Sequence, residues 1–487
     1  MKIQLVRILT VAFLSLGIVA CGGGEESDGK KTAKGILLAP ISSQSASAKV
    51  LHKEAMQAKG IQMKETCPNV PAGYKPLNNV DVEFIDGAGD TKEKTTTDEC
   101  GNFSANVPDE VTQVKAKSPG NKDLIVEVSV FQSTGSTAVA STIPVDAEYQ
   151  ISSIHMTADN KVAFSVTDTV TNNAVLGVPE SAVTATINDS DVHVLDLSSA
   201  SHVADPASIT LVMDASGSMG YGTNNILDEN GDRLVDSEGK EFSRFRMAAL
   251  AAHTYLDNMP TTDETGLVIF NHNVTYINDA SLKASFILTK ENGDATEYKF
   301  SESGYTSNAK SLRFLIDAYN PFTEIYSDYF PNSHESLHKD SPILKNGHYP
   351  WLGSTAVFDG ILKGLEKTHE RKNTRKFVIA MTDGENNSGE KDGNVVIQSA
   401  IDKAIPVYTI ALGTNDAANN SMKKIAESTN ASFFKVTGTD LVSAFQSIQT
   451  SITFQYLASL DNSANSGDTV KLTLNYNGES ANRSVIR

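Results

Sequence analysis

A short apolar run, Ile209 to Met213, ends in Asp214-Ala-Ser216-Gly-Ser218 and constrains the fold more than any other feature of this sequence. The run is too short for an ordinary helix and ends at a glycine-containing turn, which favours a central parallel strand. The turn places one carboxylate and two hydroxyls at alternate positions, and these oxygens suit a hard divalent cation. Since Ser and Asp are also ordinary turn residues, the pattern alone describes a plain strand-to-loop turn equally well.

Strand and helix patterns alternate between residues 206 and 452. Apolar runs predict strands at 209–213, 265–270, 376–382 and 405–412, and helical periodicity predicts helices at 244–259, 309–319, 395–404, 421–429 and 441–451. This alternation predicts a doubly wound α/β domain, in which ligands bind at the carboxyl ends of the strands. The rule selects two more loops. Asp383 follows the strand at 376–382, and Thr355 precedes a helix that begins near residue 357.

Together the three loops resemble the metal-ion-dependent adhesion site of a von Willebrand factor type A domain, in the family's order. The resemblance implies a Rossmann-like domain over 206–452 that binds Mg²⁺, or alternatively Mn²⁺ or Ca²⁺. It implies direct metal contacts from Ser216 and Ser218, a direct or water-mediated contact from Thr355, and mainly water-mediated contacts from Asp214 and Asp383. Two carboxylates only neutralise a divalent ion, so one exchangeable position stays electrophilic, and a partner protein's Asp or Glu can fill it. Glu385 either contacts the metal ligands without binding the metal itself or is a solvated side chain.

Two insertions distinguish the domain from a compact member of that family, at 221–243 and 276–352. The first contains an approximate tandem repeat, 227–234 and 235–242. A calcium loop would use Asp228, Asn230, Asp232 and Asp236. However, Arg233 stands where an EF-hand needs Gly, and Gly239 stands where it needs Glu. A β-hairpin is therefore favoured.

The second insertion is rich in aromatic residues, which form either a rim that selects the partner or the insertion's own small core: Tyr319, Phe322, Tyr326, Tyr329, Phe330, Tyr349 and Trp351. It also contains His334-Glu335-Ser-Leu-His338, which matches the zinc metalloprotease signature His-Glu-x-x-His. Pro331 and Pro342 leave room for only about two helical turns, and the segment lacks an apolar face. We therefore expect a binding protein and not an enzyme, with a zinc metalloprotease as the least favoured alternative.

Short alternating segments flank this domain and predict β-sandwiches. One is expected at 67–147, where Thr97–Pro108 resembles carboxypeptidase-regulatory-like or transthyretin-like modules. A second would form from 148–205 and 453–487, with the α/β domain inserted into it; the alternative is two independent β appendages. Cys67 and Cys100 form either a disulfide or two buried thiols.

The N-terminus combines Lys2 and Arg7 with an apolar run over 8–20, which is typical of a signal peptide at 1–20. The end of the run, Ile18-Val-Ala-Cys21, resembles the bacterial lipobox. This implies a lipidated Cys21, with acyl chains such as palmitate, and a tether over 21–66; a plain signal peptide is the alternative. The formal net charge of −18 argues against nucleic acid and anionic membrane surfaces as partners.

These features predict a lipoprotein of the bacterial cell envelope, at the outer membrane or cell surface. We expect it to touch the membrane through its anchor only and to bind a protein partner through a divalent metal ion. An envelope assembly or scaffold module with a structural metal is the alternative.

Overall fold

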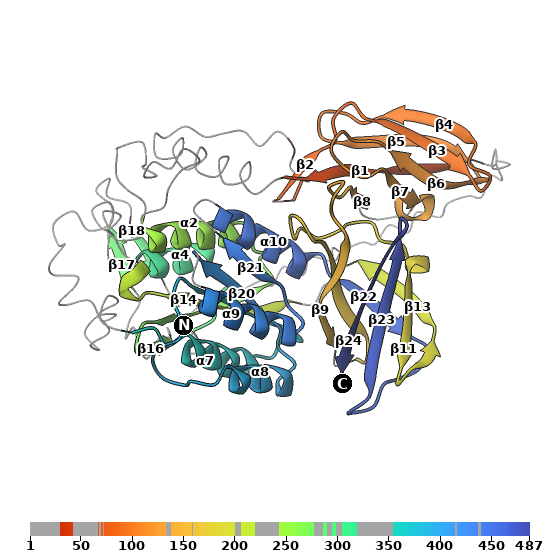
Figure 1. Cartoon of the computed structure of the whole chain (residues 1–487). Coiled ribbons are helices and arrows are strands. Elements are labelled where there is room, and N and C mark those ends of the chain that lie inside the picture. The colour runs from red at the N-terminus through yellow and green to blue at the C-terminus, as the bar shows by residue number, and fades with distance from the viewer. Residues whose placement is uncertain are drawn as a thin grey trace, which may run out of the picture.

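The chain forms one α/β domain and two β-sandwiches (Figure 1). This computed structural model describes residues 30–41, 67, 70–71, 73–132, 138–157, 159–199, 206–219, 243–276, 286–289, 295–298, 304–318, 354–413, 416–436 and 440–487. The predictions for 1–20, Cys21 and 42–66 lie outside these residues. Among the described residues, no helix has both the length and the apolar character needed to cross a membrane.

The α/β domain is built on a six-stranded sheet with the order β16-β15-β14-β19-β20-β21. Its parallel strands are β14 (Ala207–Asp214), β15 (Glu264–Phe270), β19 (Arg375–Thr382), β20 (Val407–Leu412) and β21 (Phe433–Val436). The edge strand β16 (Val274–Tyr276) is antiparallel. Every residue of the central strand β14 is buried, because helices cover both faces of the sheet.

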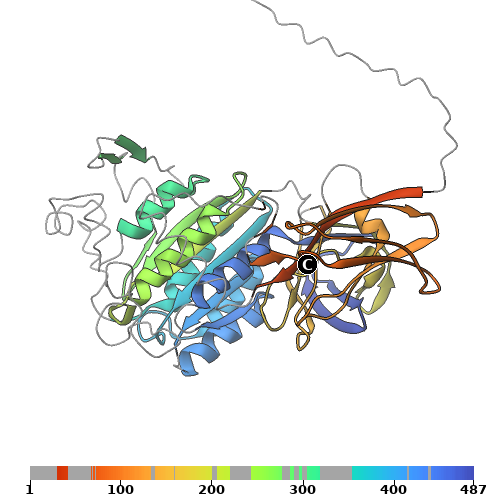
Figure 2. The same cartoon turned by 90° about the horizontal axis from the view of Figure 1, so that it is seen from above.

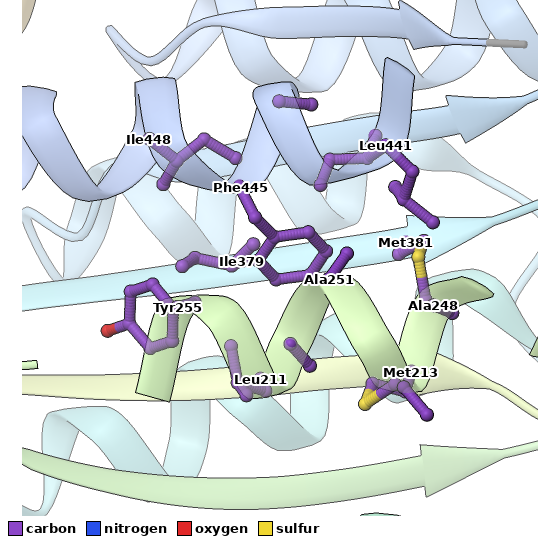
Figure 3. Packing of buried hydrophobic residues seen from close by; sticks show 14 of the residues in the cluster. Leu211, Met213, Ala248, Ala251, Tyr255, Ile379, Met381, Leu441, Phe445 and Ile448 are labelled. Atoms are coloured by element: carbon purple, nitrogen blue, oxygen red, sulfur yellow. The ribbon is translucent and has the colours of Figure 1, made fainter. Parts of the chain in front are cut away.

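Helices cover both faces of this sheet, as a doubly wound fold requires (Figures 1 and 2). On one face lie α2 (Arg244–Asp257), α4 (Ala309–Ala318) and α10 (Leu441–Thr453). On the other lie α7 (Val357–His369), α8 (Gly393–Asp402) and α9 (Asp416–Ser428). In the first layer Tyr255 of α2 and Phe445 of α10 have ring centroids 6.3 Å apart and pack over Leu211 and Ile379 of the sheet (Figure 3).

The insertion predicted at 276–352 is wrong for residues 304–318, whereas the helix predicted at 309–319 within the α/β pattern is present as α4. Leu312 and Ile316 of α4 are buried in the same core as α2, and the Tyr305 hydroxyl lies 2.5 Å from that of Thr210. An apolar pair at i and i+4 gives α4 a face to bury, so this helix belongs to the domain. Strands β17 (Phe286–Thr289) and β18 (Ala295–Tyr298) pair with each other as a separate hairpin.

The N-terminal sandwich begins earlier than the sequence predicts. One sheet contains β1 (Lys30–Pro40), β2 (Tyr74–Pro76), β5 (Asn102–Pro108) and β8 (Ala138–Ser141). The other has the order β4-β3-β6-β7, with β3 (Asp81–Asp86), β4 (Thr91–Thr96), β6 (Val111–Ala116) and β7 (Leu124–Glu127). The short helix η1 (Val128–Phe131) follows β7.

The tether predicted over 21–66 is therefore wrong for residues 30–40, which form β1. Leu37 and Ala39 face the core between the two sheets, whereas Ile36 and Leu38 face a second apolar cluster with Tyr74 and Leu176. A strand buried on both faces shows no polar alternation, and the exposed lysines at its start resemble a linker.

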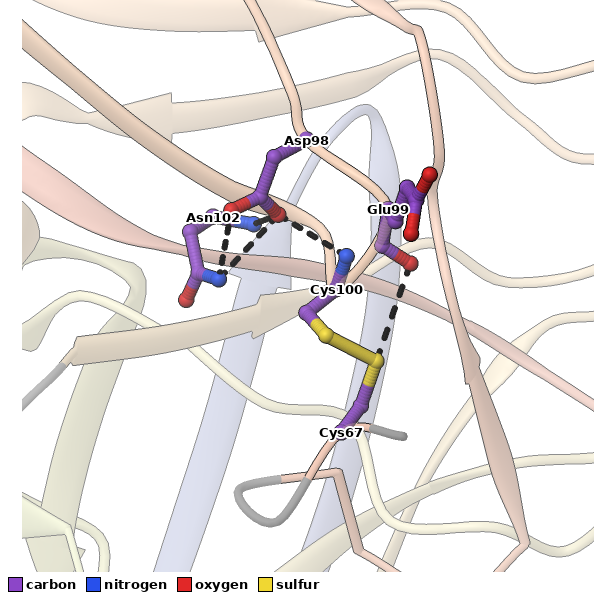
Figure 4. The surroundings of a disulfide bond; sticks show 5 residues. All are labelled: Cys67, Asp98, Glu99, Cys100 and Asn102. Carbon is purple, nitrogen blue, oxygen red and sulfur yellow. Dashed lines mark hydrogen bonds between the residues drawn. A yellow bond between two sulfur atoms is a disulfide. The ribbon is translucent and has the colours of Figure 1, made fainter. Parts of the chain in front are cut away.

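A disulfide joins Cys67 to Cys100 and attaches the segment before β2 to the turn before β5 (Figure 4). The two Cα atoms are 5.3 Å apart. The Asp98 carboxylate shapes the turn, because its Oδ1 accepts the backbone N–H groups of Cys100 and Asn102, both at 2.8 Å. This disulfide is one of the two alternatives that the sequence allowed.

The second sandwich combines strands from before and after the α/β domain. One sheet has the order β13-β22-β10-β9 and the other the order β12-β11-β23-β24. The N-terminal stretch supplies β9 (Tyr149–Met156), β10 (Val162–Asp168), η2 (Glu180–Ala182), β11 (Val183–Ile187), β12 (Ser190–Val192) and β13 (Val194–Ser199). The C-terminal stretch supplies β22 (Tyr456–Leu460), β23 (Thr469–Tyr476) and β24 (Glu479–Ile486).

The α/β domain is inserted between two neighbouring strands of this sandwich. The chain leaves the sandwich at the end of β13 and returns at the start of β22, and these strands pair with Ser199 opposite Tyr456. Residues 190–199 form two strands, because β12 pairs with β11 and β13 pairs with β22 in the other sheet. The amino ends of β19 and β20 contact β9, so the carboxyl ends of these strands lie away from the sandwich.

Candidate metal centre

Three loops meet at the carboxyl edge of the α/β sheet, and each carries side-chain oxygens. Asp214 ends β14, and the turn after it contains the short helix η4 (Gly217–Met219). A second loop begins directly after Thr382, the last residue of β19, and the third ends where α7 begins. We call the five side chains that the sequence selected on these loops the oxygen cluster: Asp214, Ser216, Ser218, Thr355 and Asp383.

The carboxylate of Asp214 is fully buried and held by two neutral donors. Its Oδ1 accepts the backbone N–H of Ser216 at 2.7 Å, and its Oδ2 accepts the Thr382 hydroxyl at 2.6 Å. Burial and, to a smaller extent, the nearby negative charge of Asp383 raise the pKa of Asp214 well above its ordinary value. The orientation of this carboxylate is therefore fixed, but neutral donors leave its charge unbalanced.

The Asp383 carboxylate connects the second loop to the first and to helix α2. Its Oδ1 accepts the Ser218 hydroxyl at 2.6 Å, and its Oδ2 accepts an N–H of the Arg244 guanidinium at 2.6 Å. The side chain of Asp383 is 0% exposed and that of Arg244 is 21% exposed. The Ser216 and Ser218 hydroxyls lie 3.1 Å apart. A chain of polar contacts thus runs from Arg244 through Asp383 into the serine turn.

Thr355 is brought to the same place by the loop that follows Asp383. The backbone N–H of Thr355 donates to Oδ1 of Asn387 at 2.6 Å, and its carbonyl accepts the backbone N–H of Asn387 at 3.0 Å. A Cβ placed on Gly384 would lie 3.5 Å from the Thr355 Oγ1 and 3.9 Å from the Ser218 Oγ. Both hydroxyls therefore lie within 4 Å of one point at the edge of the sheet.

The structure thus brings all five residues of the oxygen cluster together from three separate loops. Glu385 is exposed, which agrees with the solvated alternative for this side chain. The repeat at 227–242, the His334, Glu335 and His338 motif, and the aromatic residues from 319 to 351 lie outside the described residues.

Sequence reasoning missed three residues that hold the cluster. Thr382 is the polar end of an apolar run, and this position is its only signal. Arg244 is the first residue of a helix, and nothing in the sequence indicates that it reaches Asp383. The role of Asn387 depends on a contact 32 positions away in the chain. Only the folded structure shows the contacts that Arg244 and Asn387 make with the cluster.

The donor set fits a hard divalent ion. Every side chain of the cluster offers oxygen, and two of the five are carboxylates. In the part of the chain that the structure describes, no three His, Cys, Asp or Glu side chains gather as a metal-binding group. A site here therefore depends on hydroxyls and water as its remaining ligands. With both carboxyl groups ionised, the charges of Asp214, Asp383 and Arg244 sum to −1, and a cation would balance this excess of negative charge.

Residues 344–450 match the family described as von Willebrand factor type A domain, and the match contains Thr355 and Asp383. A comparison with curated proteins finds no match. Among solved structures, the chain is similar to an aerotolerance-related membrane protein from Bacteroides fragilis, with 17% identity over 51% of this chain and 98% of that chain and a TM-score of 0.29.

Two further structures show comparable similarity. One is a von Willebrand factor type A protein from Catenulispora acidiphila, with 11% identity over 70% of this chain and 74% of that chain and a TM-score of 0.32. The other is the vWF domain of the type V pili tip protein Mfa5 from Porphyromonas gingivalis, with 14% identity over 51% and 95% of the two chains and a TM-score of 0.31. These scores are low, and the assignment of the fold rests on the family match and on the sheet topology.

Proposed function

We propose that this chain, whose α/β domain is a von Willebrand factor type A domain, binds a protein partner through a divalent metal ion held at the oxygen cluster. One observation carries the proposal. Three loops that are far apart in sequence place two buried carboxylates and three hydroxyls at the carboxyl edge of one sheet. Arg244 compensates only one of these two buried carboxylates, so ionising both is unfavourable without a further cation.

The proposed ion is Mg²⁺, with Mn²⁺ and Ca²⁺ as alternatives. Ser216, Ser218 and Thr355 would supply neutral oxygens, while Asp214 and Asp383 would supply charge and hold coordinated water. When bound, the ion would offer an electrophilic position to one carboxylate of a partner protein. The carboxylate that accepts the Ser218 hydroxyl is itself paired with Arg244, so this contact orients a ligand, and we propose binding and not catalysis.

We further propose that the protein is displayed from a bacterial envelope membrane by a lipid on Cys21. Because β1 starts at Lys30, the segment between them could extend only about 28 Å. The Lys30 end of β1 points away from the α/β domain (Figure 2). The first sandwich would then lie close to the membrane, and the oxygen cluster would lie at the far end of the molecule. A Cys21→Ser variant should move from the membrane fraction to the soluble fraction, and an unchanged distribution would contradict the anchor.

The metal-dependent function is tested by capture from envelope extract in Mg²⁺ or in EDTA. The immobilised baits are the wild type, Asp214→Ala and Asp402→Ala, the last being an exposed carboxylate on α8 that controls for lost charge. We expect one protein to be retained by the wild type and by Asp402→Ala in Mg²⁺ only, and to be absent with Asp214→Ala. Calorimetry should show Mg²⁺ affinity lower by about 100-fold in Asp214→Ala. Retention that is equal under all conditions would refute the proposal.

A structural metal in an envelope scaffold module is the second candidate. It is favoured by the hydrogen bonds through which the three loops already hold one another, such as those from Ser218 to Asp383 and from Thr355 to Asn387. If the metal only fixed the loops, EDTA would lower the melting temperature and leave the association with the partner intact. The same capture experiment, combined with thermal unfolding in Mg²⁺ and in EDTA, separates the two candidates.

A further inference from the structure

Arg244 is a charged residue of the site that the proposed function does not use. It is the first residue of α2, directly after the N-cap Ser243, whose hydroxyl accepts the backbone N–H of Arg246 at 3.0 Å. The amino end of a helix carries a partial positive charge, so a cation is unfavourable at this position. A basic residue placed here needs a compensating partner, and Asp383 provides one.

The guanidinium of Arg244 is bonded to Asp383 and lies beside a glycine. Its Nη1 donates to the Asp383 Oδ2 at 2.6 Å. Its Nη2 faces Gly413, directly after β20, where a Cβ would lie only 3.5 Å away. Gly413 has a φ of +104°, a conformation that disfavours other residues, so this position stays open for the guanidinium. Arg244 is thus a fixed cation at the carboxyl edge and not a freely moving surface side chain.

This cation changes the net charge of a metal-loaded site. Asp214, Asp383 and a divalent ion sum to zero, and Arg244 raises the sum to +1. The extra charge repels the ion and also competes with it for the Asp383 carboxylate. The same charge attracts an approaching anion, and little water screens the attraction because the site is mostly buried.

We infer that Arg244 determines the specificity of this site: it weakens the binding of the divalent ion and strengthens the binding of an acidic side chain to the loaded site. The inference rests on the proposed function, because it assumes a metal ion at the oxygen cluster. It adds that the partner's carboxylate is recognised by two cations, the ion and the guanidinium. Opposite effects on two ligands distinguish this role from structural support, which would weaken both.

The test uses Mn²⁺ and a blocked tripeptide, acetyl-Gly-Asp-Gly-amide, as probes of the full mature chain. Calorimetry measures Mn²⁺ affinity, and then peptide affinity at saturating Mn²⁺, with the asparagine peptide as the neutral control. The variants are Arg244→Gln, Arg244→Lys and Lys423→Gln. Lys423 is an exposed cation on α9, so its removal changes the net charge equally at a distance from the site.

In Arg244→Gln we expect Mn²⁺ to bind about tenfold more tightly and the aspartate peptide about tenfold more weakly. Arg244→Lys keeps the charge and should stay near the wild type for both probes, as should Lys423→Gln. If Arg244→Gln bound both probes more weakly, or bound both as the wild type does, the inference about Arg244 would be overturned but the proposed function would stand. A lysine variant that behaved like the glutamine variant would have the same consequence. A wild type that binds neither Mn²⁺ nor the peptide would instead overturn the proposed function.

Discussion

The two ends of the α/β sheet differ in the groups that surround their buried charged side chains. At the carboxyl edge, Asp383 pairs with Arg244, whereas the buried Asp214 accepts hydrogen bonds from neutral donors, which leave its charge unbalanced when it is ionised. At the amino edge, the buried Arg375 donates to the Gln455 side chain at 3.1 Å and to the Ile452 carbonyl, both beside the second sandwich. The proposed cation would balance the charge at the first end, whereas at the second end the hydrogen bonds of the buried charge are made by the protein itself.

The same contrast appears in the neighbours of each edge. Around the amino edge, the backbone N–H of Ser153 donates to the Asn430 carbonyl at 2.6 Å, and the Ser153 hydroxyl contacts that of Tyr408. His155 packs edge-on against Phe377, with ring centroids 5.9 Å apart. These contacts hold the domain to the sandwich. Substitutions at the amino edge should therefore change stability, and substitutions at the carboxyl edge should change ligand binding.

Arg375→Met should have the largest effect and tests the amino edge. The methionine fills much of the same volume but leaves the Ile452 carbonyl and the Gln455 amide oxygen without their donor. We expect a loss of about 4 kcal/mol in the free energy of unfolding, with metal affinity unchanged. Denaturant unfolding measures the loss.

Arg313→Met is the matched control for Arg375→Met. Arg313 pairs with Asp257 at 2.6 Å, but both side chains are partly exposed, so its removal should cost less than about 1 kcal/mol. If the two variants lost equal stability, or if Arg375→Met weakened metal binding, the contrast between the edges would fail.

His155 predicts a pH dependence of stability at the amino edge. Burial and, to a lesser degree, the charge of Arg375 lower the pKa of His155 to about 4, from 6.5. The folded state therefore binds fewer protons than the unfolded state between these values. Stability is fully present above pH 6.5 and falls as the pH drops toward 4, by about 3 kcal/mol in total.

His155→Asn should remove this pH dependence of stability, because the asparagine amide keeps a donor near the position of Nδ1 but does not titrate. The check is the difference in the free energy of unfolding between the wild type and the variant at several pH values from 4 to 7, since other titrating groups then cancel. A difference that stayed constant with pH would show that His155 does not titrate as expected.

Much of the site could be predicted because its residues stand where strands end. Asp214 and Asp383 each follow an apolar run, and parallel topology alone brings such positions to one edge. The exposed sides of β11 and β23 also gave an alternating pattern that marked them as sandwich strands. Local periodicity was sufficient for these elements.

The rest depended on contacts that periodicity does not encode. Strand β1 is buried on both faces, so its residues lack alternation. Strands β12 and β13 are separated by a single residue, and only their different partners distinguish them. The contact between Arg244 and Asp383 joins residues that are 139 positions apart in the sequence, and it follows from how α2 packs on the sheet. Sequence patterns located the residues of the oxygen cluster but not the residues that hold them.

Asn387→Ala should have the smallest effect and sharpens the contrast at the carboxyl edge, given a metal ion at the oxygen cluster. Its side chain accepts one hydrogen bond, from the backbone N–H of Thr355, in the part of the chain that the structure describes, so we expect a stability loss of about 1 kcal/mol. Metal affinity should fall by about tenfold, because a loosened loop no longer fixes the Thr355 hydroxyl. Calorimetry with Mn²⁺ and thermal unfolding in EDTA measure the two effects separately.

Asn386→Ala is the control, since Asn386 accepts the backbone N–H of Phe358 at 3.2 Å and donates to the Glu390 carbonyl at 2.6 Å without contacting Thr355. It should cost comparable stability and leave metal affinity unchanged. Asn387→Asp keeps the acceptor and should restore part of the affinity. If both alanine variants weakened Mn²⁺ binding equally, metal affinity would depend on the overall rigidity of the loop. The hydrogen bond from Thr355 to Asn387 would then have no specific role in metal binding.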